Sequence, residues 1–230
     1  LVLSSIRRWL ADAIVYQSAF SHAWWERVYG PTHQPWTIVH NGVDLQNYSP
    51  EGEHERPNDR FRLLLVEGSL GGGYEIGLET AVALAQRLQS EHHLPVELVV
   101  AGRVSPAMAT EWQARAGLPL AFAGLVPTGR IPWLDRSAHL LYAADINAAC
   151  PNSVIEALAC GLPVLAFDTG ALPELVTGAS GRVVPYGGDP WRLEPPNLPA
   201  LAKAAVEVLL RQETFRTGAR HRAEAAFGLD

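Results

Sequence analysis

The sequence predicts an α/β fold built around a mostly parallel, Rossmann-like sheet. Short apolar runs of the kind that fill buried parallel strands alternate along the chain with longer stretches of helical period. Glycine-rich and polar turns separate the two kinds of segment, and the stretch from Cys150 to Val176 passes in turn through loop, helix, strand, loop and helix. Such alternation is typical of a sheet that helices cover on both faces.

Length and composition narrow the class of protein. The 230 residues are enough for one full core, or for one domain and part of another. The net charge of −6 argues against a nucleic-acid partner, which requires a basic face. Two cysteines, without the spacing of a disulfide framework or a zinc site, are typical of a reducing compartment. We therefore expect a cytoplasmic protein, at the cytoplasmic membrane face if it acts on a membrane, and no metal centre.

The first 60 residues predict a small strand–helix–strand unit and an exposed linker. Ala11–Ser18 is interpreted as a strand that leads into a capped helix, and Asn41–Asp44 closes a second strand. By this pattern alone the unit is a generic β-α-β unit. The other expected elements are a helical fragment at Leu1–Leu10, the helix Ala19–Tyr29, the strand Trp36–His40 and the polar linker Pro50–Arg60.

The rest of the chain predicts one larger domain. A strand at Phe61–Glu67 ends in the glycine-rich loop Gly68–Gly73. The helix Val154–Cys160 stops at Gly161, a natural left-handed C-cap. Glu174 either contacts a ligand or caps its own helical turn, and the cap is the preferred interpretation. The remaining expected elements are the helix Glu75–Ser90, the strand Val96–Ala101, the helix Pro106–Ala116, the strand Leu120–Phe122, a helix-rich stretch Ile131–Ala144, the strands Asp145–Ala148 and Pro163–Phe167, a helical turn at Pro173–Val176, and the helices Leu198–Arg211 and Phe215–Ala226.

Two features of the larger domain indicate a phosphate-binding edge. Pro151 precedes a helix start that Asn152 or Ser153 can cap, and helix N-termini at the rim of a parallel sheet favour phosphate groups. The loop Gly68–Gly73 lets the backbone approach a diphosphate closely, although a plain structural turn fits the pattern equally well. Glu156 lies one turn inside the helix, where its carboxylate can accept hydrogen bonds from a ribose diol or simply face water.

The stretch that begins at Asn152 resembles the signature of the "group 1" family, the retaining, nucleotide-sugar-dependent glycosyltransferases of the GT-B fold. In that family a glutamate, seven residues and a second glutamate precede Ala-x-Ala-x-Gly-x-Pro-Val. Glu156 stands at the second glutamate, which in the family binds the donor ribose, whereas the first falls at Ala148. Ser18 and Asn41–Asp44 also resemble the family's crossover from its first, acceptor-binding domain. The matching residues are Asn152–Gly161, Pro163-Val164, Thr169-Gly170 and Pro173-Glu174.

The resemblance implies that the chain is the donor-binding half of such an enzyme. Residues 1–44 would be the end of the acceptor domain and the crossover, 45–60 a linker, and 61–230 the donor-nucleotide-binding domain. It implies a UDP- or GDP-linked sugar as substrate, no cofactor, and a role in polysaccharide, glycolipid or glycoconjugate synthesis. Most of a first domain before Leu1 and a closing helix after Asp230 are expected to be missing, so this chain alone is expected to be inactive. Peripheral membrane contact would come through that missing domain.

Three charged positions of the family's donor site differ in this chain. Ser69 takes the place of an arginine in the glycine-rich loop, no lysine follows it before Ser90, and Ala148 replaces the first glutamate. Each lost charge-assisted contact ordinarily removes about 1.5–3 kcal/mol of binding. Arg103 is either a substitute cation from the same rim or a solvated surface residue. In one branch of the family a Pro-Asn segment replaces the first glutamate, and there Asn152 would contact the donor.

These departures leave two hypotheses: half of a glycosyltransferase, or a non-catalytic nucleotide-binding or interaction module that kept the fold. Leu125 and Val126 follow Gly124 where the family's backbone brackets the nucleobase, or they pack as ordinary loop residues. No catalytic residue and no metal ligand is assigned in this chain. The predicted donor-binding residues are Gly68, Ser69, Gly71, Arg103, Leu125, Val126, Asn152, Ser153, Val154 and Glu156.

Overall fold

In a computed structural model, which describes residues 2–70 and 75–229, the chain forms one large and one small parallel sheet. Within the described residues the large sheet has six strands in the order β5-β4-β3-β6-β7-β8, which confirms the predicted α/β, Rossmann-like architecture. The small sheet pairs β1 with β2. The strands are β1 (Ile14–Tyr16), β2 (Trp36–Ile38), β3 (Phe61–Ser69), β4 (Val96–Arg103), β5 (Leu120–Gly124), β6 (Leu140–Ala143), β7 (Val164–Phe167) and β8 (Gly181–Val184).

Helices cover both faces of the large sheet. Buried residues of α3, α4 and α8 share one hydrophobic cluster, and those of α5, α6 and the later turns of α9 share the other. Leu63, Leu64 and Leu65 of β3 are 0% exposed and alternate between the two clusters, as the pleat of a strand requires. None of the helices in the described ranges has the length and apolarity needed to cross a membrane. The helices are α1 (Val2–Ser5), α2 (Ala19–Tyr29), α3 (Glu75–Ser90), α4 (Pro106–Ala116), α5 (Ile131–Arg136), α6 (Asn152–Ala159), α7 (Leu172–Leu175), α8 (Leu198–Leu210) and α9 (Gln212–Ala226), with single turns at Ile6–Leu10, Thr128–Arg130, Gly178–Ser180 and Pro190–Arg192.

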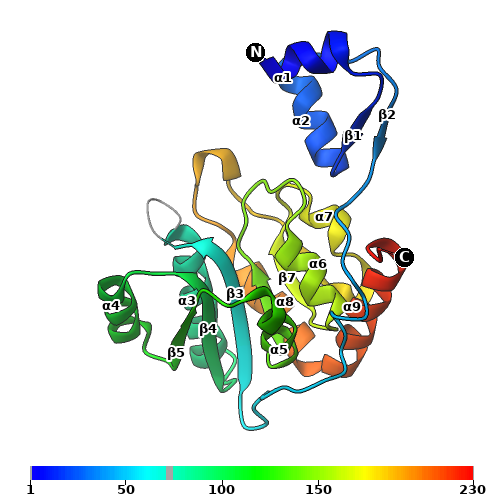
Figure 1. The fold of residues 1–230 in the computed structure, drawn as a ribbon. Coiled ribbons are helices and arrows are strands. Elements are labelled where there is room, and N and C mark those ends of the chain that lie inside the picture. The colour runs from blue at the N-terminus through cyan, green and yellow to red at the C-terminus, as the bar shows by residue number, and fades with distance from the viewer. Residues whose placement is uncertain (1, 71–74, 230) are drawn as a thin grey trace.

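The first 40 residues form a small unit above the large sheet (Figure 1). In this first unit α2 connects the two strands, and it begins with a capping box in which the Ser18 side chain accepts from the Ser21 backbone N–H. The chain then runs beside the larger domain to reach β3 (Figure 1). On the way Val43 donates its backbone N–H to the Phe227 carbonyl at 2.7 Å. The crossover and the end of α9 therefore lie side by side.

The stretch between β5 and α6 differs from the prediction. The expected helix through Ile131–Ala144 and the expected strand at Asp145–Ala148 are wrong, because α5 ends at Arg136 and Leu140–Ala143 forms β6. An apolar run of this length fits a buried helix and a buried strand equally well. Tertiary pairing decides the outcome, since β6 lies between β3 and β7 in the sheet.

Two other segments extend the sheet beyond the prediction. Gly68 and Ser69, expected as the start of a loop, continue β3 alongside β4. The edge strand β8, which the sequence analysis did not assign, begins at Gly181. A Cβ there would lie 1.9 Å from the Val164 carbonyl oxygen of β7, so glycine is required for the two strands to meet. The glycine-rich loop itself continues into residues 71–74, which lie outside the described ranges.

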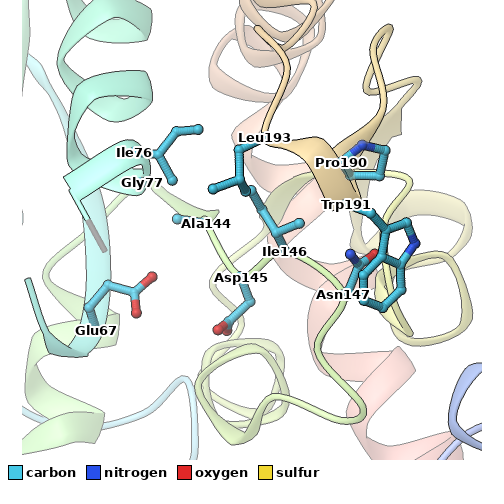
Figure 2. Close-up of a pocket in the computed structure, with 10 residues that line it drawn as sticks. All are labelled: Glu67, Ile76, Gly77, Ala144, Asp145, Ile146, Asn147, Pro190, Trp191 and Leu193. Carbon is cyan, nitrogen blue, oxygen red and sulfur yellow. The ribbon is translucent and has the colours of Figure 1, made fainter. Parts of the chain in front are cut away.

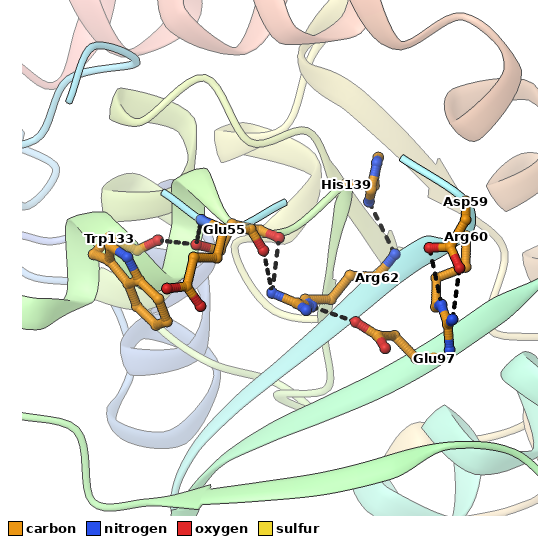
Figure 3. Close-up of polar contacts among 8 residues, drawn as sticks. Glu55, Asp59, Arg60, Arg62, Glu97, Trp133 and His139 are labelled. Carbon is orange, nitrogen blue, oxygen red and sulfur yellow. Dashed lines mark hydrogen bonds and ion pairs between the residues drawn. The ribbon is translucent and has the colours of Figure 1, made fainter. Parts of the chain in front are cut away.

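A polar network binds the linker to the amino-terminal edge of the large sheet (Figure 3). Arg62, at the start of β3, forms an ion pair with Glu97 at 2.5 Å and donates to the Glu55 carbonyl at 2.8 Å. The backbone N–H of Arg62 donates to Nδ1 of His139 at 2.9 Å, and the Ser137 hydroxyl accepts from the Glu55 N–H. The linker is exposed, as predicted, and it is fixed to the domain by these contacts.

Candidate functional site

The loops that follow the parallel strands meet at one edge of the large sheet, which we call the carboxyl rim. The predicted site residues come from four strands and the segments after them, so the fold brings distant parts of the chain to one edge. Gly71 lies outside the described residues. Gly68 and Ser69 end β3, Arg103 ends β4, Leu125 and Val126 follow β5, and Asn152, Ser153, Val154 and Glu156 belong to α6, which follows β6.

The first turn of α6 is open at the carboxyl rim. Pro151 occupies the N-cap position and makes no side-chain hydrogen bond, so the expected cap by Asn152 or Ser153 does not form. Among the described residues, no group bonds the backbone N–H groups of Asn152 and Ser153. The exposed side chain of Asn152 accepts instead from Nδ2 of Asn41 at 2.7 Å. A helix N-terminus with free N–H groups carries partial positive charge, so this turn is suited to an anion.

Glu156 lies one turn further along α6 and is half-buried. The Tyr48 hydroxyl donates to its Oε1 at 3.4 Å. Burial raises the pKa of the Glu156 carboxyl, and the Tyr48 hydrogen bond opposes that shift. Asp135, 1% exposed, is near enough that burial and the Glu156 charge raise its own pKa. A carboxylate has about four acceptor positions, so one long hydrogen bond from a phenol leaves Glu156 able to accept from a diol.

The other predicted residues of the rim differ in accessibility. Arg103 is exposed at the end of β4, and Leu125 is 61% exposed after β5. Val126 packs against the second hydrophobic cluster, as expected of an ordinary loop residue. The only lysine of the sequence, Lys203, belongs to α8 and not to the glycine-rich segment. Arg103 therefore remains the predicted cation of this rim.

Glu174 connects the carboxyl rim to the first unit. Its two carboxylate oxygens accept the backbone N–H groups of Ala19 at 2.7 Å and Phe20 at 2.8 Å, which open α2. The interpretation of Glu174 as the cap of its own helical turn is therefore wrong, because it caps a helix 155 residues away. Trp191, in the turn after β8, stacks on Trp24 of α2 with ring centroids 4.2 Å apart. The hydrogen bonds of Glu174 and the stacking of Trp191 on Trp24 thus both hold α2 against the carboxyl rim.

A cavity of about 440 Å³ lies at the same rim (Figure 2). Glu67 reaches it from the end of β3, Asp145 and Asn147 from the loop after β6, and Trp191 from the turn after β8. The sequence analysis missed these four residues, because a carboxylate after an apolar run is common and carries no motif. None of the predicted donor-binding residues in the described ranges lines this cavity. The other lining residues are Ile76, Gly77, Ala144, Ile146, Pro190 and Leu193.

The Asp145 charge acts on the Glu67 carboxyl within this cavity. Burial, with the Asp145 charge as the second cause, raises the pKa of Glu67 to about 7. Burial raises the pKa of Asp145 as well. Both shifts arise because water is partly excluded from the carboxylates, and among the residues that the structure describes no cation opposes either shift. The cavity therefore disfavours anions, in contrast to the first turn of α6.

The described residues show no obvious metal or thiol chemistry. Across residues 2–70 and 75–229, no three His, Cys, Asp or Glu side chains converge in a way that could hold a metal ion. Both cysteines, Cys150 and Cys160, are free and buried. Burial raises the pKa of each thiol, which disfavours the reactive thiolate.

Comparison with known proteins decides the family. Residues 62–210, more than half of the chain, match the family described as Glycosyl transferases group 1. This chain belongs to the group 1 glycosyltransferases. A GDP-mannose-dependent alpha-(1-6)-phosphatidylinositol dimannoside mannosyltransferase from Mycobacterium tuberculosis is 27% identical over 222 residues, which cover 93% of this chain and 53% of that protein. The chain thus spans about half the length of that curated relative.

Solved structures of this group 1 chain's neighbours show the same fold. Sucrose-phosphate synthase from Thermosynechococcus elongatus has a TM-score of 0.78 at 21% identity, over 99% of this chain and 57% of its own. The Anabaena protein Alr3699/HepE, in complex with UDP and glucose, has a TM-score of 0.73 at 18% identity, over 99% of this chain and 62% of its own. The expected GT-B relationship of the Rossmann-like domain is confirmed at the level of fold.

Proposed function

We propose that the chain is the donor-binding half of a retaining glycosyltransferase that uses a UDP- or GDP-linked sugar. The observation that carries the proposal is the open first turn of α6 at the carboxyl rim, with Glu156 one turn behind it. The free N–H groups of Asn152 and Ser153 would hold the diphosphate, and Glu156 would accept from the ribose diol. Leu125 would lie against the nucleobase, and Arg103 would add positive charge.

The relatives support a nucleotide-linked sugar as the donor. The Mycobacterium tuberculosis protein is named as GDP-mannose-dependent, and the Anabaena protein was solved with UDP and glucose. These nucleotides share a ribose and a diphosphate and differ in the base, so the proposal covers both. The acceptor, in polysaccharide, glycolipid or glycoconjugate synthesis, would bind to a further domain opposite the rim. A lipid acceptor would place the reaction at the cytoplasmic face of the membrane.

The chemistry required at this rim is mainly stabilisation of charge. When the sugar is transferred, the bond from its anomeric carbon to the diphosphate breaks, and negative charge develops on the leaving phosphate oxygen. Backbone N–H groups fixed at a helix start stabilise that charge without reorganising, which is where such donors contribute most. Retention requires the acceptor hydroxyl to approach from the face that the diphosphate leaves, so closure of a second domain would supply the orientation.

A non-catalytic module is the second candidate, and one contact favours it. Asn41 of the crossover already donates to the side chain of Asn152, which the donor site would need. Ser69 and Ala148 also stand where the family carries charge. Such a module would keep the fold and bind nucleotides weakly, without dependence on Glu156.

Calorimetric titration with UDP and with GDP tests the proposal. The wild-type protein is expected to bind one of them, and Glu156→Gln is expected to weaken that binding about tenfold or more, because it removes the charge from a hydrogen-bond acceptor. Glu213→Gln, an exposed carboxylate in the first turn of α9, is the control and should leave binding unchanged. Millimolar binding of both nucleotides, unaltered by Glu156→Gln, would reject the proposal and favour the module.

A further inference from the structure

The rim cavity and the open turn of α6 have opposite electrostatic character. Glu67 and Asp145 place two carboxylates in the cavity, and no Lys or Arg is among the described residues that line it. A phosphate inside it would be repelled at short range by each of these carboxylates that is ionised. The two halves of a sugar nucleotide differ in the same sense, since the diphosphate is anionic and the sugar is neutral.

The two carboxylates have unused hydrogen-bonding capacity. The pKa of Glu67 is shifted by burial and by the Asp145 charge, and that of Asp145 by burial alone, with no hydrogen bond among the causes in the described residues. Partly buried polar groups are normally hydrogen-bonded, to protein or to solvent. Groups that are held only by solvent in a concave site are ready to accept from the hydroxyl groups of a ligand.

The walls that carry these carboxylates are fixed by close backbone packing. Gly102 has φ 147, and a Cβ there would lie 2.3 Å from the Glu67 carbonyl oxygen, so only glycine lets β4 pass this close to Glu67. The Thr169 hydroxyl donates to the Asp145 carbonyl at 3.4 Å, which ties the loop after β6 to the loop after β7. Asn147 adopts φ 59, a left-handed conformation in which asparagine is enriched. The polar side of the cavity is therefore preorganised.

The opposite side of the cavity is apolar. Ile146 and Leu193 line it together with Trp191 (Figure 2). Trp191 keeps 51% of its surface exposed although it stacks on Trp24. An aromatic ring and aliphatic groups facing two carboxylates match a pyranose, which has C–H faces and a circumference of hydroxyl groups. The volume of about 440 Å³ lies within the range of small-molecule pockets.

We propose that this cavity holds the neutral sugar of the donor, with Glu67 and Asp145 accepting from its hydroxyl groups and Trp191 packing against its ring. The inference rests on the proposed function, which assigns residues to the diphosphate, the ribose and the base of the donor. It adds the residues that would bind the sugar. Asn147 and Asn152 are five positions apart in the chain, a stretch that spans at most about 18 Å, so a single short loop connects the cavity to the open turn of α6.

The test compares each nucleoside diphosphate with its sugar-linked form by calorimetry. UDP is paired with UDP-glucose and GDP with GDP-mannose. The dissociation constant of the bare diphosphate divided by that of its sugar-linked form measures the affinity that the sugar adds. In Glu67→Gln and Asp145→Asn, which preserve shape and remove charge, this ratio should fall about tenfold, while the affinity for the bare diphosphate stays the same or rises slightly. Glu79→Gln, exposed on the same helix that borders the cavity, is the control. Thermal unfolding confirms that each variant is folded.

The outcomes separate this inference from the proposed function. If neither diphosphate binds the wild-type protein, the proposed function fails and the inference fails with it. If a diphosphate binds but the sugar increment is the same in wild type, Glu67→Gln and Asp145→Asn, the inference alone is overturned. Binding of the bare diphosphate that requires Mg²⁺ and is lost in Glu67→Gln would assign the carboxylates to a cation and would also overturn it.

Discussion

Replacing Glu174 should loosen the first unit from the larger domain. Its carboxylate accepts from two backbone N–H groups at the start of α2, and its side chain is 25% exposed. Hydrogen bonds to a charged group contribute about 1.5–3 kcal/mol, and a carboxylate at a helix N-terminus contributes about 0.3–1 kcal/mol. Because two bonds to one partly exposed carboxylate do not add fully, we expect a loss of about 2 kcal/mol in Glu174→Ala. This corresponds to roughly a 30-fold change in an equilibrium constant.

Amide hydrogen exchange at Ala19 and Phe20 measures this contact directly. In Glu174→Ala, exchange at these amides should be about 30-fold faster, and Glu174→Gln, which keeps a neutral acceptor, should lie between it and wild type. Glu111→Gln breaks an exposed pair with Arg115 on α4 and serves as the control, with a change below about threefold. Unchanged exchange in Glu174→Ala, or equal changes in all three variants, would refute the idea that this carboxylate holds the first unit in place.

Three further predictions concern stability, each measured by urea unfolding. Burial and nearby arginines lower the pKa of His139 to about 4, so between about pH 6.5 and 4 the unfolded chain binds this proton first; the contribution of His139 to stability, measured as wild type minus His139→Asn, should fall with falling pH by at most about 1.4 kcal/mol per unit, and a difference that does not change with pH would contradict this. Burial and the Asp145 charge raise the pKa of Glu67 to about 7, so the folded chain binds this proton first between about pH 4.5 and 7; the contribution of Glu67 to stability, measured as wild type minus Glu67→Gln, should fall as pH rises through this window, and a constant difference would contradict this. Gly102→Ala should cost about 2–3 kcal/mol because its Cβ meets backbone, whereas Gly117→Ala, at φ 65 with no atom within 4 Å, should cost about 1 kcal/mol, and equal costs would show that the contact is unimportant.

The elements that sequence predicts best are those fixed by local chemistry. The helices Glu75–Ser90 and Pro106–Ala116 have the predicted bounds. The second is delimited by its own neighbours, since the Ser105 hydroxyl accepts from the Met108 N–H at 3.2 Å and Gly117 ends the helix in a left-handed conformation. By contrast β6 was placed too late in the chain, because an apolar run carries no local signal that distinguishes a buried strand from a buried helix. Its position depends on pairing with β3 and β7, which lie far away in sequence.

The candidate site also has features that local sequence predicts and features that depend on long-range packing. The position of the first turn of α6 could be predicted, because a helix start after a buried strand must lie at the carboxyl rim, whereas the expected cap by Asn152 or Ser153 does not form. The partner of Glu174 could not, since nothing in the residues around it specifies a helix 155 positions earlier. The cavity could not be predicted either, because Glu67 comes from the end of β3, Asp145 from the loop after β6 and Trp191 from the turn after β8, and none of them belongs to a motif. Long-range packing, and not residue type, makes them neighbours.

The unusual residues of this rim have a joint consequence for selectivity. In the family the cations of the glycine-rich loop bind the diphosphate in the donor and in the released product alike, so they strengthen both by similar amounts. Here Ser69 stands at the position of that arginine, which under the proposed function would weaken both by about 1.5–3 kcal/mol. If Glu67 and Asp145 bind the sugar, they contribute to the donor alone, and their charge repels a bare diphosphate that shifts toward the cavity. The donor would then be favoured over the product by the sugar contacts themselves, so the absence of that cation and the presence of the two carboxylates would act in the same direction, toward release of the nucleotide after transfer.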